Sequence, residues 1–194
     1  MYVDSMSARI APLEPPYDPE VGDQLARMMP PGVEPIGLFR TFVRNIEMTR
    51  AMGAWGAYEL GRSLSLSMRE RELVIDRTCA RCGCEYEWGV HVGFFADRVG
   101  LTPDQITSIT HGRPDDTCWT DERERALLAL VDSLHDHADV DDALWDEVAR
   151  HFDERQLLDA TMLCGWYHAI SFAANGARVD LEPGAPHFTN YASQ

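Results

Sequence analysis

Apolar side chains recur at steps of three and four residues along most of this chain, and that spacing places them on one face of an α-helix. No segment shows the strict alternation of apolar and polar residues that is typical of a half-buried strand. The predicted helices cover residues 19–29, 36–44, 46–60, 68–82, 84–99, 103–111, 121–137, 142–152 and 154–175. The pattern therefore predicts an all-α fold, a single-domain bundle of about eight or nine helices.

Local signals mark where several of these helices begin and end. Ser67 and Glu70 form a capping box, in which each side chain bonds the other residue's backbone N–H, so a helix should begin directly after Ser67. Gly83 is a typical stop for that helix. Two further capping boxes open later helices, at Thr102 and at Asp153.

The two ends of the chain differ in composition from its middle. Residues 1–35 are rich in proline and acids, and proline restricts both itself and the residue before it. We therefore expect an extended N-terminal arm, broken by the short helix at 19–29, that lies across a neighbouring subunit or along its own surface. Residues 36–181 form the helical domain, and residues 182–194 a loosely ordered tail.

Several histidines fall on the last long helix and the helices before it. The segment 154–175 is apolar nearly all round, which predicts a central helix. Its polar and aromatic positions include Cys164, Trp166, Tyr167 and His168. His168 either reaches a central pocket or is a core histidine with satisfied hydrogen bonds. His135 and His137 end an earlier helix, where positive charge suits the helix dipole, and we interpret them as terminal residues rather than ligands.

The stretch 69–101 carries the most chemistry. Cys84, Glu87 and His91 stand at positions i, i+3 and i+7 of one predicted helix, so they share a face. Glu72 lies on the preceding helix, and a tight antiparallel hairpin would return it to the same pocket. Two carboxylates, a thiol and an imidazole are suited to acid–base or thiol chemistry. The same residues also fit a surface Glu–His pair and a cysteine packed beside an aromatic ring.

Glu72, the run Cys84-Glu85-Tyr86-Glu87-Trp88 and His91 resemble the signature of the carboxymuconolactone decarboxylase family, which shares its fold with alkylhydroperoxidase D. The peroxidase pattern is Glu, eleven residues, then Cys-x-x-Cys-x-x-x-His. Glu87 takes the place of the second cysteine, and a glutamate there resembles the decarboxylase-like branch. The likeness runs from about residue 36 to residue 181. It implies an AhpD-like fold and a ring-like homo-oligomer, a trimer or hexamer, that works without a cofactor.

The resemblance implies an enzyme that uses acid–base chemistry on a small carboxylated or lactone-like molecule. His91 would transfer the proton, while Glu72 and Glu87 orient it and tune its pKa. We assign substrate binding to Arg77, Trp88 and His168. The arginine would hold a substrate carboxylate through a bidentate contact.

Two other functions remain open. In a thiol-dependent alkylhydroperoxidase, Cys84 would be the nucleophile and His91 or Glu72 its base. The oxidised thiol would then be resolved by Cys82, by Cys79 or by an external thiol. Alternatively, the chain is a non-catalytic helical oligomer whose pocket binds a small ligand. A thiol titration separates these cases, because a low pKa at Cys84 supports the peroxidase.

Other cysteine and metal patterns are weaker. Cys79 and Cys82 form a Cys-x-x-Cys late in a predicted helix, whereas redox pairs usually lie at a helix N-terminus, where the dipole lowers the thiol pKa. Whether the Cys79–Cys82 pair is redox-active stays open. The residues Glu72, Cys84, Glu87 and His91 are of metal-ligand types. No second Cys-x-x-Cys or His-x-x-x-His completes a zinc pattern, so we expect no metal.

Charge and cysteine content narrow the partners and the compartment. The 194 residues carry a formal net charge of −15, which repels nucleic-acid phosphates and anionic membranes, so we expect neither as a partner. All 17 basic residues are arginine, which excludes a lysine Schiff base. Five cysteines, three of them within six residues, do not make a disulfide scaffold. Without a signal-peptide or membrane-span pattern, we predict a cytoplasmic protein acting on a small-molecule substrate.

Overall fold

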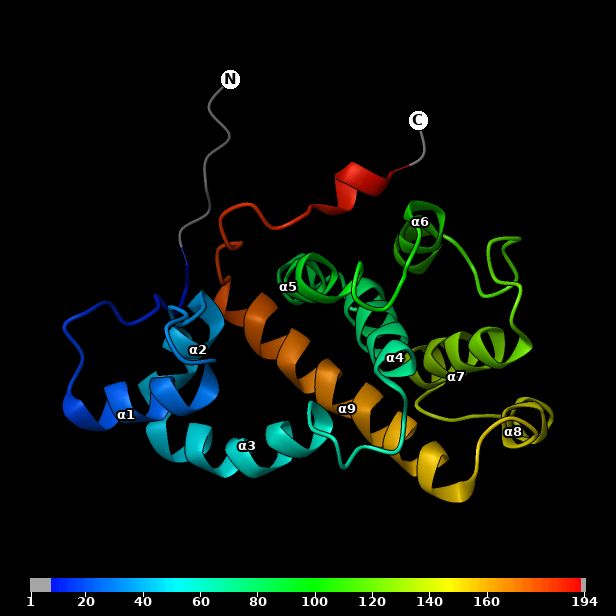
Figure 1. Cartoon of the computed structure of the whole chain (residues 1–194), viewed down its shortest axis with the longest axis horizontal. Helices are drawn as coiled ribbons and strands as arrows, with labels where there is room; N and C mark the ends of the chain where they lie inside the picture. The colour runs from blue at the N-terminus through cyan, green and yellow to red at the C-terminus, as the bar shows by residue number, and fades with distance from the viewer. Residues whose placement is uncertain (1–7, 193–194) are drawn as a thin grey trace.

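The computed structural model describes residues 8–192, and within that range the chain forms nine α-helices, two short 3₁₀-helices and no β-strand. The helices are α1 (Pro19–Met28), α2 (Gly37–Phe42), α3 (Ile46–Glu59), α4 (Met68–Arg81), α5 (Glu85–Phe95), α6 (Pro103–His111), α7 (Glu122–His137), α8 (Asp142–Ala149) and α9 (Glu154–Ala177). The 3₁₀-helices are η1 (Val43–Asn45) and η2 (Phe188–Tyr191). The predicted all-α architecture and helix number are confirmed (Figure 1).

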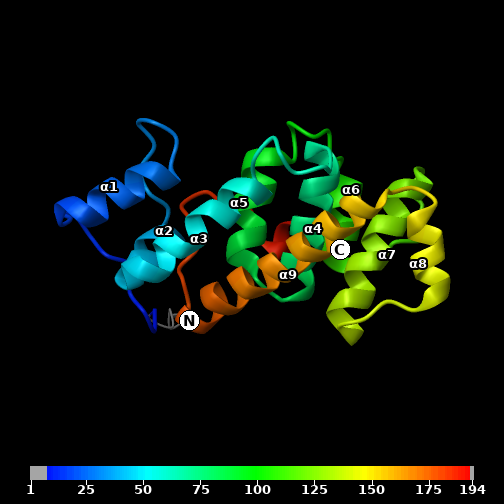
Figure 2. The ribbon, with the colours of Figure 1, turned by 90° about the horizontal axis from the view of Figure 1, so that it is seen from below.

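Helix α9 runs through the middle of the molecule, with α1, α2 and α3 towards one end and α7 and α8 towards the other (Figures 1 and 2). Helix α4 packs against α5, α6, α7 and α9, so it is the second central element. All residues from 70 to 79 are buried, although five of these ten are charged. Buried charges must be paired or neutralised, so the sequence of α4 predicts internal ion pairs.

The ends of the helices follow local signals, with a few differences from the sequence analysis. The capping boxes at Ser67, Thr102 and Asp153 are all present. Helix α5 ends at Phe95 rather than near Val99, because the chain turns there and the Leu101 N–H donates to the Ala96 carbonyl over 2.9 Å. Helix α8 also ends earlier than predicted, at Ala149.

The C-terminal tail, predicted to be loosely ordered, packs against the domain up to residue 192. The rings of Phe188 and Tyr191 stand edge-on to Trp88, with centroids 4.9 and 5.7 Å away. A Cβ atom at Gly89 would lie 2.8 Å from the Pro186 carbonyl oxygen, so only glycine allows the tail to approach α5 this closely. The expectation of a loose tail is wrong because aromatic burial outweighs the absence of regular secondary structure.

The N-terminal arm lies along its own chain from residue 8 onwards; residues 1–7 are outside the described part. The Arg9 N–H donates to the Ala177 carbonyl at the end of α9, over 2.8 Å, and the Leu13 N–H to the Arg40 carbonyl, over 3.0 Å. The arm therefore straps the N-terminal helices to α9. This is one of the two placements that the sequence left open.

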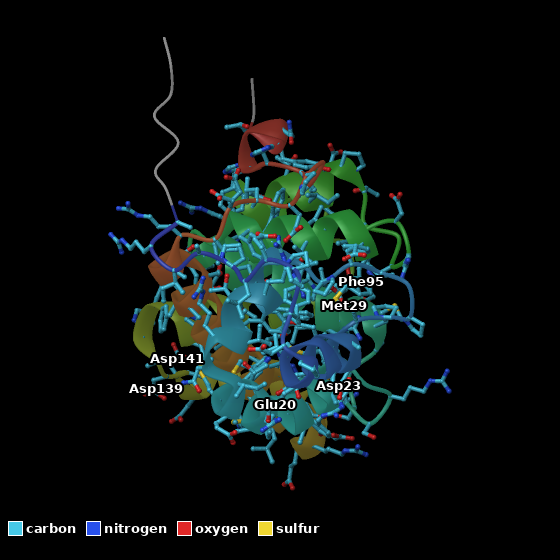
Figure 3. All side chains as sticks on the ribbon, turned by 90° about the vertical axis from the view of Figure 1, so that its left-hand side faces the viewer. Glu20, Asp23, Met29, Phe95, Asp139 and Asp141 are labelled. Carbon is cyan, nitrogen blue, oxygen red and sulfur yellow. The ribbon has the colours of Figure 1, made fainter. Side chains whose placement is uncertain are left out.

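The surface is acidic, as the net charge requires. Figure 3 labels four exposed acids: Glu20 and Asp23 lie on α1, and Asp139 and Asp141 lie in the loop before α8, towards the opposite end of the molecule (Figure 1). None of the helices between residues 8 and 192 combines the length and hydrophobicity needed to cross a lipid bilayer.

Candidate functional site

The candidate site is built around the imidazole of His91 on α5. Its Nδ1 atom lies 2.8 Å from Glu72 Oε2 on α4, and its Nε2 atom lies 3.0 Å from the Tyr167 hydroxyl on α9. Glu87, one turn earlier on α5, places Oε1 3.7 Å from Nε2. No side chain in this cluster is more than about a tenth exposed. Three helices thus hold one buried histidine between two carboxylates and a phenol.

The hairpin between α4 and α5 brings Glu72 back to His91, as the sequence analysis predicted. Gly83 takes a left-handed conformation (φ +60°), and the Cys84 N–H donates to the Cys79 carbonyl over 2.8 Å. This tight turn sets the two helices antiparallel. Residues nineteen apart in sequence therefore meet in the core.

The charge state of His91 is set by its carboxylate neighbours. Burial opposes a charged imidazole, but the charge and hydrogen bond of Glu72, helped by those of Glu87, raise the pKa of His91 to about 10. At neutral pH the ring is an imidazolium, which donates Nδ1–H to Glu72 and Nε2–H to the Tyr167 oxygen.

Glu72 is the ionised centre of a larger buried network. Burial would raise its pKa, yet the positive charges of His91 and Arg71 and their hydrogen bonds lower it. Arg71 Nε donates to Glu72 Oε1 over 2.7 Å. Asp76, one turn further along α4, has its pKa raised well above the ordinary value, by burial and then by the charge of Glu72. One turn of α4 therefore holds two carboxyls whose pKa values are shifted in opposite directions, downwards at Glu72 and upwards at Asp76.

Cys84 caps the N-terminus of α5 and is fully buried. Burial raises the pKa of its thiol to about 11, and the charge of Glu87 adds to that rise. A low pKa of Cys84 is expected for a peroxidase, whereas the pKa of this thiol is raised in the structure. A reacting Cys84 needs a base beside it, and Glu87 is one turn away.

Glu87 has a free oxygen. Its Oε1 atom faces His91, whereas Oε2 is buried and has no hydrogen-bond partner among residues 8–192. A buried oxygen without a partner is costly, and such atoms are common where a substrate, a proton or a water binds. This atom is the most direct indication of chemistry in the cluster.

Arg77 does not take part in this site. Its guanidinium forms a bidentate pair with Asp132 on α7, both contacts at 2.7 Å, and also donates to the backbone carbonyls of Ser108, Ile109 and Gly112. Each nitrogen of this buried guanidinium has at least one partner, and Arg77 joins α4 to α6 and α7. The structure therefore places Arg77, predicted to bind the substrate, outside the His91 cluster.

Trp88 and His168 are also absent from the cluster. Trp88 is fully buried under the C-terminal tail, and its contacts there are aromatic. His168 Nε2 pairs with His135 Nδ1 at 2.9 Å, and its Nδ1 faces the Cys164 carbonyl. The hydrogen bonds and ring contacts of these two residues are thus made with other groups than His91, and the predicted role of Trp88 and His168 in substrate binding stays a prediction.

Sequence reasoning missed three members of the network: Arg71, Asp76 and Tyr167. Asp76 lies one turn after Glu72, and this spacing is a usable signal. Tyr167 lies on a helix that is apolar nearly all round, so no pattern distinguishes the face that meets α5. Burial raises the pKa of Tyr167 well above its ordinary value, which keeps the phenol neutral.

Two groups of side chains in residues 8–192 have ligand atoms close enough to share a metal ion. Glu72, Asp76 and His91 form one, but there the Nδ1 atom of His91 already bonds Glu72. Cys82, His135 and His168 form the other, at the far end of α4. Two surface hollows lie elsewhere, one between α1 and the loop that follows it and one between α7 and α8.

The profile of the carboxymuconolactone decarboxylase family matches residues 47–132, which include the α4–α5 hairpin. This segment of the chain is similar to the carboxymuconolactone decarboxylase family, the family that the sequence resembles. Tyr167 lies outside the matched residues, so the family segment supplies three of the four groups in the buried cluster. No curated protein sequence matches the chain.

Several solved structures share the fold of this chain at low sequence identity. A protein of unknown function from Agrobacterium tumefaciens is 24% identical, with a TM-score of 0.65 over 73% of this chain and 95% of that chain. An uncharacterized peroxidase-related protein from Silicibacter sp. TM1040 is 18% identical, with a TM-score of 0.76 over 94% of this chain and 98% of that chain. The debrominase Bmp8, in complex with 2,3,4-tribromopyrrole, is 16% identical, with a TM-score of 0.74 over 92% of this chain and 94% of that chain. These similarities confirm the predicted AhpD-like fold.

Proposed function

We propose that this protein is a thiol-dependent hydroperoxide reductase, with Cys84 as nucleophile and Glu87, His91 and Glu72 as the groups that handle protons. The observation that carries the proposal is the free Oε2 atom of Glu87, buried one helical turn from Cys84 and facing a charged imidazole through its other oxygen. Structural neighbours support thiol chemistry: one is peroxidase-related, and the debrominase complex was obtained with a cysteine-to-alanine variant.

The reaction needs a base for the thiol and an acid for the leaving group. Glu87 takes the proton from Cys84, whose thiol is otherwise held protonated by burial. The thiolate attacks the terminal oxygen of the hydroperoxide, the O–O bond breaks, and Cys84 becomes a sulfenic acid. The departing alkoxide takes a proton supplied by the His91 imidazolium and leaves as an alcohol. An external thiol then condenses with the sulfenic acid, releasing water, and a second external thiol restores Cys84.

The neighbouring residues keep His91 and Glu72 in their charged forms. Glu72 holds His91 as an imidazolium, and Arg71 in turn holds Glu72 as a carboxylate. The resembling peroxidases carry a second cysteine where this chain has Glu87. Cys84 therefore cannot form a disulfide with a residue at that position. Regeneration therefore runs through an external thiol or through Cys79 or Cys82, which are both unpaired.

The test is consumption of an organic hydroperoxide, such as cumene hydroperoxide, in the presence of dithiothreitol. We expect Cys84→Ser to abolish turnover, and Glu87→Gln to lower it by on the order of 10²–10⁴, the usual effect of losing an acid–base group. Trapping with dimedone and mass spectrometry should place the sulfenic acid on Cys84. Cys118→Ser is the matched control, because Cys118 lies in the loop between α6 and α7 and should leave turnover unchanged.

A second function, the acid–base lyase that the sequence analysis placed first, is favoured by one observation. The resting thiol of Cys84 has a raised pKa, whereas His91 and its carboxylates are arranged to move protons whether or not the sulfur reacts. In that case the substrate is a small carboxylated or lactone-like molecule. On such a substrate, Cys84→Ser would keep more activity than His91→Ala. If hydroperoxide turnover survives Cys84→Ser, the peroxidase proposal is wrong.

We also propose that the protein self-associates, as the family resemblance implies. Leu158, Met162 and Phe172 on α9 are exposed by 66%, 49% and 67%, an unusual number of large apolar side chains for the face of a central helix. A second copy of the chain is the occupant we propose for this face. A trimer or a hexamer is the expected assembly.

A further inference from the structure

Three side chains of metal-ligand type meet at the C-terminal end of α4, away from the His91 cluster. Cys82 is the C-cap residue of α4, His135 lies in the last turn of α7, and His168 lies on α9. One ligand atom from each of the three lies within 4.8 Å of the other two. All three are half-buried, so the group is closed by protein on one side and open on the other.

The spacing of the atoms suits a tetrahedral ion. His135 Nδ1 lies 2.9 Å from His168 Nε2 and 3.9 Å from the Cys82 sulfur. Zinc bonds of about 2.0–2.1 Å to nitrogen and 2.3 Å to sulfur, at tetrahedral angles, separate ligand atoms by roughly 3.3–3.6 Å. The observed separations lie on both sides of that range, so small side-chain rotations produce the coordination geometry.

The surroundings orient two of the three ligands. His168 Nδ1 lies 2.8 Å from the Cys164 carbonyl oxygen, which can only accept, so Nδ1 carries the hydrogen and the lone pair of Nε2 points at His135. Metal-bound histidines usually donate their second N–H in this way. On the thiol side, the Asn175 side chain donates to the Cys82 carbonyl over 3.1 Å and holds the cap in place.

The charge nearest to the group is already balanced. Arg81, next to Cys82, would repel a cation, but its guanidinium pairs with Asp136 and lies 3.7 Å from Asp132. Asp132 is also paired with Arg77, so the two acids and the two arginines beside the group balance in charge. Helix α7 also presents its C-terminus here, the end of a helix that favours positive charge.

We propose that Cys82, His135 and His168 bind one divalent transition-metal ion, best matched by Zn²⁺, with a fourth position open to water or another small ligand. A thiolate with two imidazoles is a borderline-soft donor set that suits zinc and disfavours magnesium and calcium. Binding releases the proton of the Cys82 thiol to solvent. The sequence hides this site, because its ligands come from three helices and follow no spacing rule. The site does not depend on the proposed peroxidase function.

The test uses Co²⁺ as a spectroscopic probe of the full-length protein and Zn²⁺ as its competitor. We expect one Co²⁺ per chain, with intense visible bands typical of a tetrahedral site and a near-ultraviolet thiolate-to-cobalt band that Zn²⁺ removes. Cys82→Ser should abolish the thiolate band. His135→Gln and His168→Gln should each weaken binding by at least about 100-fold, since loss of an outer partner alone already costs 10- to 100-fold.

Control variants locate the ion. His137→Gln, two residues along α7, and Cys118→Ser remove the same chemical groups from outside the site and should bind Co²⁺ as the wild type does. Circular dichroism checks that each variant is folded. Binding that is absent in the wild type, unchanged in both Cys82→Ser and His168→Gln, or lost only in His91→Asn would overturn the proposal; the last result would move the ion to the Glu72–Asp76–His91 group.

Discussion

Two histidine clusters lie against α9, and they differ in what surrounds the imidazoles. His91 is sealed in the core between Glu72, Glu87 and Tyr167. The pair of His135 with His168 lies half-exposed at the other end of α4, beside a thiol. In the first cluster the acids keep a hydrogen on both nitrogens of the ring. In the second, His135 Nδ1–H donates to the lone pair of His168 Nε2, and a metal ion would replace that hydrogen.

The pKa of His91 is raised and that of His135 is lowered, and burial alone does not explain this difference. Burial lowers the pKa of both histidines. At His91 the charge of Glu72 outweighs burial, whereas at His135 the neighbouring His168 and Arg81 add to its effect. The sign of the nearest charge therefore decides whether a histidine of this protein is held as an acid or left as a neutral ligand.

The largest expected effect comes from removing the acid that defines the first cluster. Glu72→Gln leaves His91 and Arg71 buried without their carboxylate, and breaking a buried ion pair in this way typically costs about 3–5 kcal/mol. Urea denaturation at pH 7 should show that loss. Glu47→Gln removes an exposed acid paired with Arg50 and should change the free energy of unfolding by less than about 0.5 kcal/mol. Equal effects of the two substitutions would contradict the buried pair.

The pH dependence of stability tests the same pair. The pKa of His91 is about 10 in the folded protein and near 6.5 when exposed, so its stabilising contribution is complete below about pH 6.5 and is lost as the pH rises through 10. The pKa of Glu72 is lowered, so its contribution is lost at the acidic end instead. The melting temperature should therefore fall between pH 7 and pH 10, and should fall less steeply in Glu72→Gln. An equal slope in both proteins would show that His91 is not held charged.

A smaller effect should follow from deleting residues 184–194, whose described part, up to residue 192, packs on α5. The deletion removes the Phe188 and Tyr191 rings from Trp88, and partial loss of two aromatic contacts should cost about 2 kcal/mol. Tryptophan fluorescence should shift to longer wavelength, because Trp88 becomes exposed to water. The Co²⁺ binding at Cys82 should be unchanged, since the tail lies at the other cluster. An unshifted emission would mean that the tail does not bury Trp88 in solution.

A substitution on the exposed face of α9 should have the smallest effect on the stability of the fold. It should have a clear effect on the assembly of the protein. Phe172→Glu places a charge where the side chain is 67% exposed, so the monomer's stability should change by less than about 0.5 kcal/mol. Analytical ultracentrifugation should show a smaller assembly than the wild type. Val33→Glu, at an apolar residue exposed by 46% in the loop after α1, is the control and should leave the assembly size unchanged. Monomeric wild type would remove the basis of the proposed oligomer.

Local signals in the sequence specify the helices, their caps and three of the four members of the sealed cluster. Helical periodicity and capping boxes depend only on neighbours in the chain, so they can be read without tertiary information. The hairpin is predictable for the same reason, because the stop at Gly83 and the helical spacing of Glu87 and His91 are local. Those signals are enough to predict that Glu72 returns to His91.

Tertiary packing determines which polar side chains are free to act. Arg77 has the chemistry of a substrate anchor, yet each of its three side-chain nitrogens already bonds an acceptor on α7 or at the C-terminal end of α6. Tyr167 and His168 are adjacent on α9, but they point into different clusters, because neighbouring residues of a helix lie about 100° apart around its axis. Contacts between helices depend on how the faces pack, and an apolar helix such as α9 carries no pattern that reveals the packing in advance.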